Sequence, residues 1–317
     1  MADEEAAAAG DGEAGAHAAS TLPRLFLRAM RTHHRSAALL YRDGERWREV
    51  PDWRFERQVI RLALFLRDRA ALAPGDHVVI VSSLRPELAV AELAPVAQGA
   101  PSVAIDPTLP PDQLALALTA AAPAVVIVEN ANLREQIGSA QRAVIAIDGK
   151  PRDGWTWSEA LDLGGTLDTP ERAQSFRARA REVPATGPAL GQIVARDGAV
   201  QCQFIDQQDA VGGVSRVWAD VPPVQGDATY VAGPVTLGAR IACFAAIGDG
   251  FTRCAFGTPG KEPAEVAELR PKRIVASADV VERARRAASP PPVGRSTPAR
   301  RVLDWLKART ELTDRKS

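Results

Sequence analysis

The chain has 317 residues, of which 46% are hydrophobic and 25% charged, a composition typical of a folded globular protein with one large core or two smaller ones. Lys and Arg number 39 and are balanced by 39 Asp and Glu, so no overall positive charge favours nucleic acid or an anionic membrane. The three cysteines, Cys202, Cys243 and Cys254, lack the Cys-x-x-Cys spacing of zinc sites and redox pairs. We therefore expect reduced core thiols and no metal site.

The first 19 residues are mostly Ala, Gly and acidic residues. Such a segment cannot bury enough apolar surface to offset its ordering entropy, so residues 1–19 are predicted to be a disordered tail. It lacks the basic start and apolar core of a secretory signal, and no run of about 18 apolar residues occurs anywhere. We expect no transmembrane segment and a cytoplasmic location.

Residues 20–150 predict a first α/β unit, which starts with a helix after Ser20 or Thr21. Arg42-Asp43-Gly44 then predicts a hairpin turn with glycine at positive φ. Asp52 is an expected N-cap for the amphipathic helix that follows.

The rest of this unit alternates strands and helices. The nearly continuous β-branched run at 77–81 is typical of a strand buried on both faces, which implies a parallel sheet. Further strands are expected at 102–105, 125–128 and 144–147, with helices at 86–98 and after Pro111. This alternation predicts the α/β fold class, built from βαβ units with right-handed crossovers.

The rest of the chain divides by pattern into three parts. Residues 151–188 are interpreted as a connecting region with one helix near 171–181. Residues 189–286 predict a second, partial α/β unit, with a hairpin at residues 192–205 and a helix capped near Asp206. Residues 287–317 are interpreted as a Pro-rich spacer and a terminal helix.

Several short segments of the first unit follow one another in a specific order and spacing. They are Gly75-Asp76-His77-Val78, Arg85-Pro86-Glu87, Ala97-Gln98-Gly99-Ala100-Pro101 and Asp106-Pro107-Thr108-Leu109-Pro110. Together they resemble the N-terminal region of the AMP-forming acyl-CoA synthetases, in the long-chain fatty-acid-CoA ligase branch. The resemblance implies the layered βαβ sheets of the N-terminal subdomains in that family. It also implies activation of a carboxylic acid with Mg-ATP and acyl transfer to coenzyme A.

The sequence departs from this family where the phosphate loop is expected. A Thr-Ser-Gly-Thr-Thr-Gly-x-Pro-Lys-Gly stretch should fall between Ile193 and Phe204, where the chain has Arg196, Asp197 and Gly198. The hydroxyls, the lysine and nearly all the glycines are missing, and Asp197 would place a carboxylate beside phosphate. These three residues mark the degenerate phosphate-loop position, and we expect no catalytic residue and no bound cofactor.

Other family motifs are also missing. The Leu-Pro-x-x-His segment that forms a wall of the acyl pocket would match residues 232–236, which contain no histidine. The Tyr-Gly-x-Thr-Glu motif is absent, because neither Tyr41 nor Tyr230 precedes a glycine. The ribose-binding aspartate, the hinge and the catalytic lysine of the family would lie beyond Ser317.

Four further candidates have simpler interpretations. Gly257-Thr258-Pro259-Gly260-Lys261 lacks the first glycine and the hydroxyl of a Walker loop and is interpreted as a strand-to-helix turn. Gly248-x-Gly250 is interpreted as a turn, and His33-His34 as a solvated helix end without metal partners. Glu87 and Asp106 are interpreted as supports for turns and caps.

The sequence thus predicts a truncated, catalytically incomplete member of this family, a pseudoenzyme or remnant that binds an acyl compound or a protein partner. One alternative is one half of a split acyl-CoA ligase, completed by a partner chain. Another is a structural protein that self-associates into a homo-oligomer through an exposed sheet edge.

Overall fold

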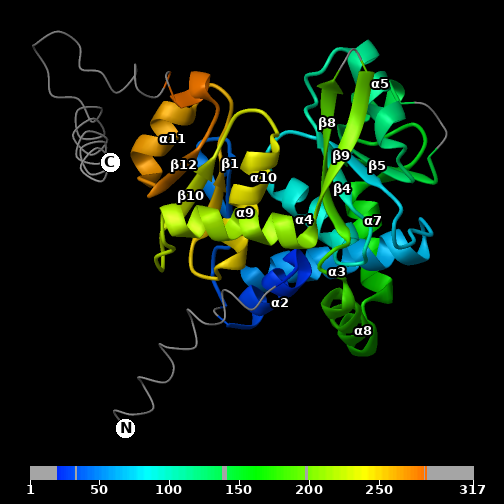
Figure 1. Cartoon of the computed structure of the whole chain (residues 1–317), viewed down its shortest axis with the longest axis horizontal. Coiled ribbons are helices and arrows are strands. Elements are labelled where there is room, and N and C mark those ends of the chain that lie inside the picture. Colours follow the sequence, from blue (N-terminus) through cyan, green and yellow to red (C-terminus); the bar gives the residue numbers. More distant parts are fainter. Residues whose placement is uncertain (1–19, 33, 138–140, 197–198, 282, 284–317) are drawn as a thin grey trace, which may run out of the picture.

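The computed structural model describes residues 20–32, 34–137, 141–196, 199–281 and 283. Within them, a larger and a smaller sheet lie side by side, with helices around and between them (Figure 1). The strand orders are β7-β6-β5-β3-β4-β8-β9 and β12-β10-β11-β1-β2. The predicted tail, spacer and terminal helix lie outside the described residues, as do His33, Asp197 and Gly198.

The larger sheet contains β3 (Val78–Val81), β4 (Ser102–Ile105), β5 (Val125–Asn130), β6 (Ala143–Asp148), β7 (Trp155–Thr156), β8 (Pro188–Arg196) and β9 (Ala199–Asp206). The smaller sheet contains β1 (Leu39–Asp43), β2 (Arg46–Val50), β10 (Ala228–Val231), β11 (Arg253–Phe256) and β12 (Arg273–Val275). The helices are α2 (Leu22–Thr32), α3 (Asp52–Asp68), α4 (Pro86–Val96), α5 (Pro111–Ala121), α6 (Ala131–Glu135), α7 (Trp157–Leu167), α8 (Pro170–Glu182), α9 (Gln207–Asp220), α10 (Leu237–Gly248) and α11 (Glu262–Leu269).

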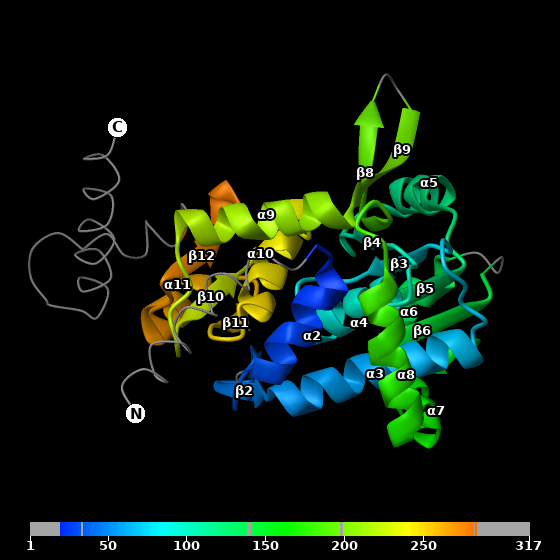
Figure 2. The same ribbon diagram turned by 60° about the horizontal axis from the view of Figure 1, so that its bottom comes forward.

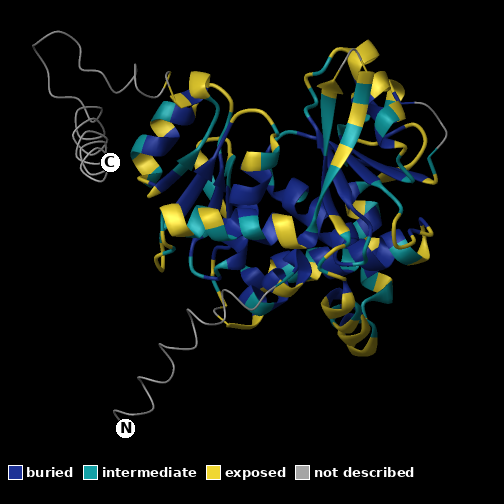
Figure 3. Ribbon diagram, in the orientation of Figure 1, coloured by how far each residue is buried: buried dark blue, intermediate teal, exposed yellow. Residues whose placement is uncertain are grey.

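Strand β3 forms the centre of the larger sheet and confirms the predicted α/β class. It pairs in parallel with both β4 and β5, and all of its side chains are buried (Figure 3). Val78 and Ile80 belong to the main core on one face, while Val79 and Val81 pack with residues of α5 and α6 on the other. An apolar residue at every position is therefore needed, because helices cover both faces.

The smaller sheet takes two strands from the N-terminal part of the chain. β1 pairs antiparallel with β2 and in parallel with β11. The register pairs Asp43 with Arg46, so the predicted hairpin turns at Gly44 and Glu45, with Gly44 at φ 62°. The larger sheet in turn takes β8 and β9, so the division into residues 20–150 and 189–286 does not coincide with the sheets. Long-range packing, rather than proximity in the sequence, decides these neighbours.

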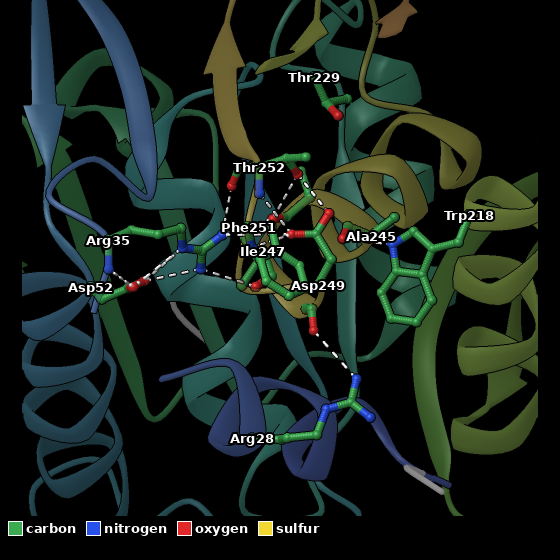
Figure 4. Close-up of polar contacts among 12 residues, drawn as sticks. Arg28, Arg35, Asp52, Trp218, Thr229, Ala245, Ile247, Asp249, Phe251 and Thr252 are labelled. Carbon is green, nitrogen blue, oxygen red and sulfur yellow. Dashed lines mark hydrogen bonds and ion pairs between the residues drawn. The ribbon is translucent and has the colours of Figure 1, made fainter. Parts of the chain in front are cut away.

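Asp52 was expected to be an N-cap, and this expectation is wrong. Pro51 occupies the cap position without a side-chain hydrogen bond, and Asp52 is already helical. Its carboxylate instead accepts from Arg35, with Nη2 2.9 Å from Oδ1 (Figure 4). The same guanidinium donates to the carbonyls of Ile247 and Thr252, so this buried pair fastens α3 to the C-terminal end of α10.

The stretch 151–188 contains more structure than the connecting region that was expected. Its start adds β7 to the larger sheet, and the helices α7 and α8 follow. Helix α7 begins with a capping box in which the side chains of Thr156 and Glu159 each accept from the backbone N–H of the other residue. The prediction of a single helix near 171–181 is confirmed only for α8, and α7 was missed.

No helix among the described residues is long and apolar enough to cross a membrane.

Candidate functional site

A cavity of about 590 Å³ lies between the two sheets, at the carboxyl end of β4. The β8–β9 hairpin, which projects from the body in Figure 2, forms one of its walls. Helix α5 and the beginning of α10 form the others. The lining residues are Ala104, Ile105, Asp106, Leu109, Gln113, Leu116, Ala117, Gln192, Ile193, Ala195, Val200, Val235, Thr236, Leu237 and Arg240.

Most of this lining is apolar, and part of it is open to solvent. Leu116 of α5 is 54% exposed. The volume falls within the range of about 300–1,000 Å³ that small-molecule sites occupy. Apolar walls with a few polar groups are also typical of such sites. The cavity is therefore the candidate binding site of the chain.

Arg240 forms the buried side of the cavity and joins α10 to the larger sheet. Its side chain is 1% exposed and is ion-paired with Glu92 of α4, which is 2% exposed. Nη1 donates to the carbonyl of Gly191 at 2.6 Å, and Nη2 donates to the carbonyl of Ser102 at 3.1 Å. Burial raises the pKa of Glu92, and the charge of Arg240 opposes this increase. One arginine from α10 thus holds α4, β4 and β8 together.

Thr236 and Asp106 lie at the open side of the cavity, at the ends of their elements. Thr236 caps α10, because its Oγ1 accepts from the N–H of Ala239 at 3.2 Å. Oδ1 of Asp106 accepts from the N–H of Thr108 at 2.9 Å and from its hydroxyl at 2.6 Å. The expected turn-supporting role of Asp106 is confirmed. Val235 and Thr236, which match the acyl-pocket segment by resemblance, do line the cavity.

At the degenerate phosphate-loop position, the described residues are Arg196, which ends β8, and Ala199, which begins β9. β8 and β9 pair antiparallel as far as Arg196 opposite Ala199, so only residues 197 and 198 connect them. A loop that surrounds phosphate needs a run of backbone N–H groups directed at one point. Here the residues on either side of the turn belong to the ladder, and the sequence supplies neither the hydroxyls nor the lysine. The sequence at this position therefore lacks the residue types that the family uses to hold the triphosphate of Mg-ATP.

The remaining candidates of the sequence lie away from the cavity. Gly257–Lys261 connects β11 to α11, as the strand-to-helix interpretation predicts, and Lys261 pairs with Glu45 at 2.9 Å. Gly250 forms a turn after α10 with φ 76°. Glu87 pairs with Arg85 at 2.8 Å. Among the described residues, which include His34, no group of His, Cys, Asp and Glu is arranged to hold a metal ion.

Sequence reasoning missed the polar residues of the cavity, and only some of them left a signal. Arg240 is the only charged residue of α10, and Glu92 is the only charged residue of α4 beyond its first turn, a pattern that indicates a buried ion pair. Gln113 and Gln192 occupy positions where surface polar residues are common, and nothing local distinguishes them.

Comparison with known proteins agrees with this architecture. Residues 26–183 match the family described as AMP-binding enzyme. The curated proteins contain no sequence that matches the chain.

Solved structures share the fold. A long-chain-fatty-acid CoA ligase from Rhodopseudomonas palustris has a TM-score of 0.69 and 17% identity, over 84% of this chain and 65% of the ligase. Acetoacetyl-CoA synthetase from Streptomyces lividans has a TM-score of 0.67 and 21% identity, over 84% of this chain and 44% of the synthetase. Coronafacic acid ligase from Pectobacterium brasiliense has a TM-score of 0.70 and 13% identity, over 86% of this chain and 53% of the ligase.

The chain thus spans less than two thirds of the length of each of these structures. Through residues 26–183 the chain belongs to the AMP-binding enzyme family, and it has the α/β fold of the N-terminal domains of adenylate-forming enzymes.

Proposed function

We propose that this chain binds an acyl compound in the cavity between the two sheets and does not adenylate it on its own. Support for binding comes from the largely apolar lining and from the exposed Leu116 beside it. The solved structures with the same fold include a long-chain-fatty-acid CoA ligase and an acetoacetyl-CoA synthetase, both of which are named for acyl substrates. An acyl chain is the ligand class that these observations share.

The observation that carries the loss of adenylation is the in-register hairpin. Arg196 pairs with Ala199, so only two residues separate β8 from β9 at the position where the family has a glycine-rich phosphate loop. Electrostatic stabilisation at the α-phosphate requires donors and cations placed in advance around it. Without them, Mg-ATP and coenzyme A have no role in the proposed function of this chain, which is that of a binding protein.

The proposal is tested by blocking the cavity. Ala195 is exposed on β8 and lines the cavity, so Ala195→Trp adds a large ring to the opening without replacing a buried residue. The matched control is Gln201→Trp, an exposed position on the same hairpin that does not line the cavity. Titration calorimetry with octanoate and octanamide should detect at least one ligand. Ala195→Trp should weaken its binding by about tenfold or more, which corresponds to at least about 1.4 kcal/mol.

Two results would contradict this proposal. One is that neither octanoyl compound binds to the folded protein. The other is that the two tryptophan variants weaken binding equally, which would place the ligand elsewhere.

A second function is one half of a split ligase. It is favoured by the family fold together with the missing phosphate-loop residues, which a partner chain would supply. In that case ATP–pyrophosphate exchange should be absent from the purified chain and appear when the partner is added. Absence of exchange in a lysate that contains every protein of the source organism would count against it.

A further inference from the structure

The cavity differs from an ordinary carboxylate site in its charges. A carboxylate ligand is usually held by an arginine or lysine whose N–H groups are directed at it. Among the described residues that line the cavity, the only cation is Arg240, and the only anion is Asp106. The availability of these two charges therefore decides which head group the cavity accepts.

The charge of Arg240 is already used by the protein. The guanidinium donates to the Glu92 carboxylate, to the carbonyl of Gly191 and to both oxygens of Ser102. Its side chain is 1% exposed, so a ligand in the cavity cannot displace these partners without separating α10 from β4 and β8. A second carboxylate would also meet Glu92 as a competitor of the same sign.

Asp106 presents the opposite charge to the cavity. Thr108 binds its Oδ1, and no cation of the described residues lies within 4.0 Å of either oxygen. Within the described residues, the carboxylate therefore has no counter-charge beside the lining. It repels a ligand carboxylate at the open side of the cavity, because like charges at short distance in a partly desolvated site disfavour binding.

The other polar groups are neutral and suit an uncharged head group. The side-chain amides of Gln113 and Gln192 each offer a donor and an acceptor, and neither has a hydrogen-bond partner among the described residues. The hydroxyl of Thr236 accepts from Ala239 and keeps its own hydrogen for donation. These groups can satisfy the carbonyl of an amide, an ester or a thioester.

We infer that the cavity selects acyl compounds with an uncharged head group, such as amides or esters, and discriminates against free carboxylates. This inference rests on the proposed function, since it specifies the ligand class of the same cavity. It differs from the carboxylic-acid substrates that the sequence resemblance implies. Asp106 is the residue that sets the preference.

The test compares octanamide with octanoate, which have the same chain and nearly the same shape. By titration calorimetry at neutral pH, octanamide should bind the full chain at least about tenfold more tightly than octanoate. Asp106→Asn removes the charge and keeps an oxygen that can accept from Thr108. It should raise the affinity for octanoate by about tenfold and leave octanamide nearly unchanged.

The control is Asp112→Asn, which removes a carboxylate from the first turn of α5 outside the cavity lining. It should leave the preference unchanged. Equal or tighter binding of octanoate by the unmodified chain would overturn this inference while the proposed function stands. An equal effect of the two Asn variants would overturn the role of Asp106. Failure of both ligands to bind would overturn the proposed function and this inference with it.

Discussion

Two walls of the cavity differ in how the protein holds them. The α10 wall is fixed from inside, because Arg240 reaches α4, β4 and β8 through buried hydrogen bonds. The β8–β9 wall projects from the body, and exposed residues alternate with half-buried ones along β9 (Figure 2). This second wall contains the position where the sequence departs from the phosphate loop of the family, while the segment 232–236, which lacks the family histidine, leads into the α10 wall. The buried framework thus has the fold of the family, and in the proposed function the projecting segment lacks the groups needed for chemistry, which proteins commonly carry on loops.

The largest expected effect comes from removing the buried ion pair between Arg240 and Glu92. Arg240→Met leaves Glu92 buried without its counter-charge, which should lower the free energy of unfolding by about 3–5 kcal/mol. Urea denaturation followed by circular dichroism measures this change. The surface control is Arg48→Met, whose partner Asp43 is 60% exposed and which should cost at most about 1 kcal/mol. Similar losses in the two variants would remove the distinction between buried and exposed contacts.

A double variant sharpens this result. Glu92→Met together with Arg240→Met replaces both charges by apolar groups and should recover most of the stability that the single change removes. If the double variant is less stable than Arg240→Met alone, then the ion pair is not the reason for the loss.

The same pair predicts a pH dependence. Burial raises the pKa of Glu92, and Arg240→Met removes the charge that opposes this rise. A carboxyl with a raised pKa stays protonated in the folded state at pH values where the unfolded chain has lost the proton, so stability falls as pH rises through that window. The variant should therefore lose more stability than the unmodified chain between about pH 5 and pH 8.

Denaturation at both pH values tests this expectation. Glu92→Gln in the Arg240→Met background removes the titrating group and should remove the additional slope. A slope that persists in that double variant would assign the pH dependence to another residue.

A smaller effect is expected at the exposed end of the α10 wall. Thr236→Ala removes the N-cap of α10 and should cost about 1 kcal/mol, within a range of about 0.5–2. Thr236→Ser keeps the acceptor oxygen and should remain close to the unmodified chain. Thermal denaturation of the two variants distinguishes them, and equal melting temperatures would show that the cap does not stabilise the helix.

Local patterns predicted most of the fold, and contacts between distant segments explain the errors. The apolar run at 78–81 was sufficient to predict a buried parallel strand. Asp52 has the residue type of a cap, but Arg35 binds it instead, and sequence alone does not show that contact. The capping box at Thr156 was a local signal that was overlooked. Strands β1 and β2 lie in the smaller sheet and strands β8 and β9 in the larger one, and this placement depends on the packing of the whole chain.

The cavity was predictable only in part. Family resemblance placed residues 232–236 at the acyl pocket, and Val235 and Thr236 do line it. Gln113 and Gln192 come from α5 and β8, and only the folded chain brings them to one cavity. Their side chains leave no periodic or spacing signal, so the polarity of the cavity required the structure.

Parallel titrations of the purified chain with Mg-ATP and with octanamide test the central claim most directly. The account predicts binding of octanamide and no heat of binding with Mg-ATP, because the hairpin replaces the phosphate loop. A micromolar dissociation constant for Mg-ATP would contradict it, since that affinity requires about 8 kcal/mol of organised contacts.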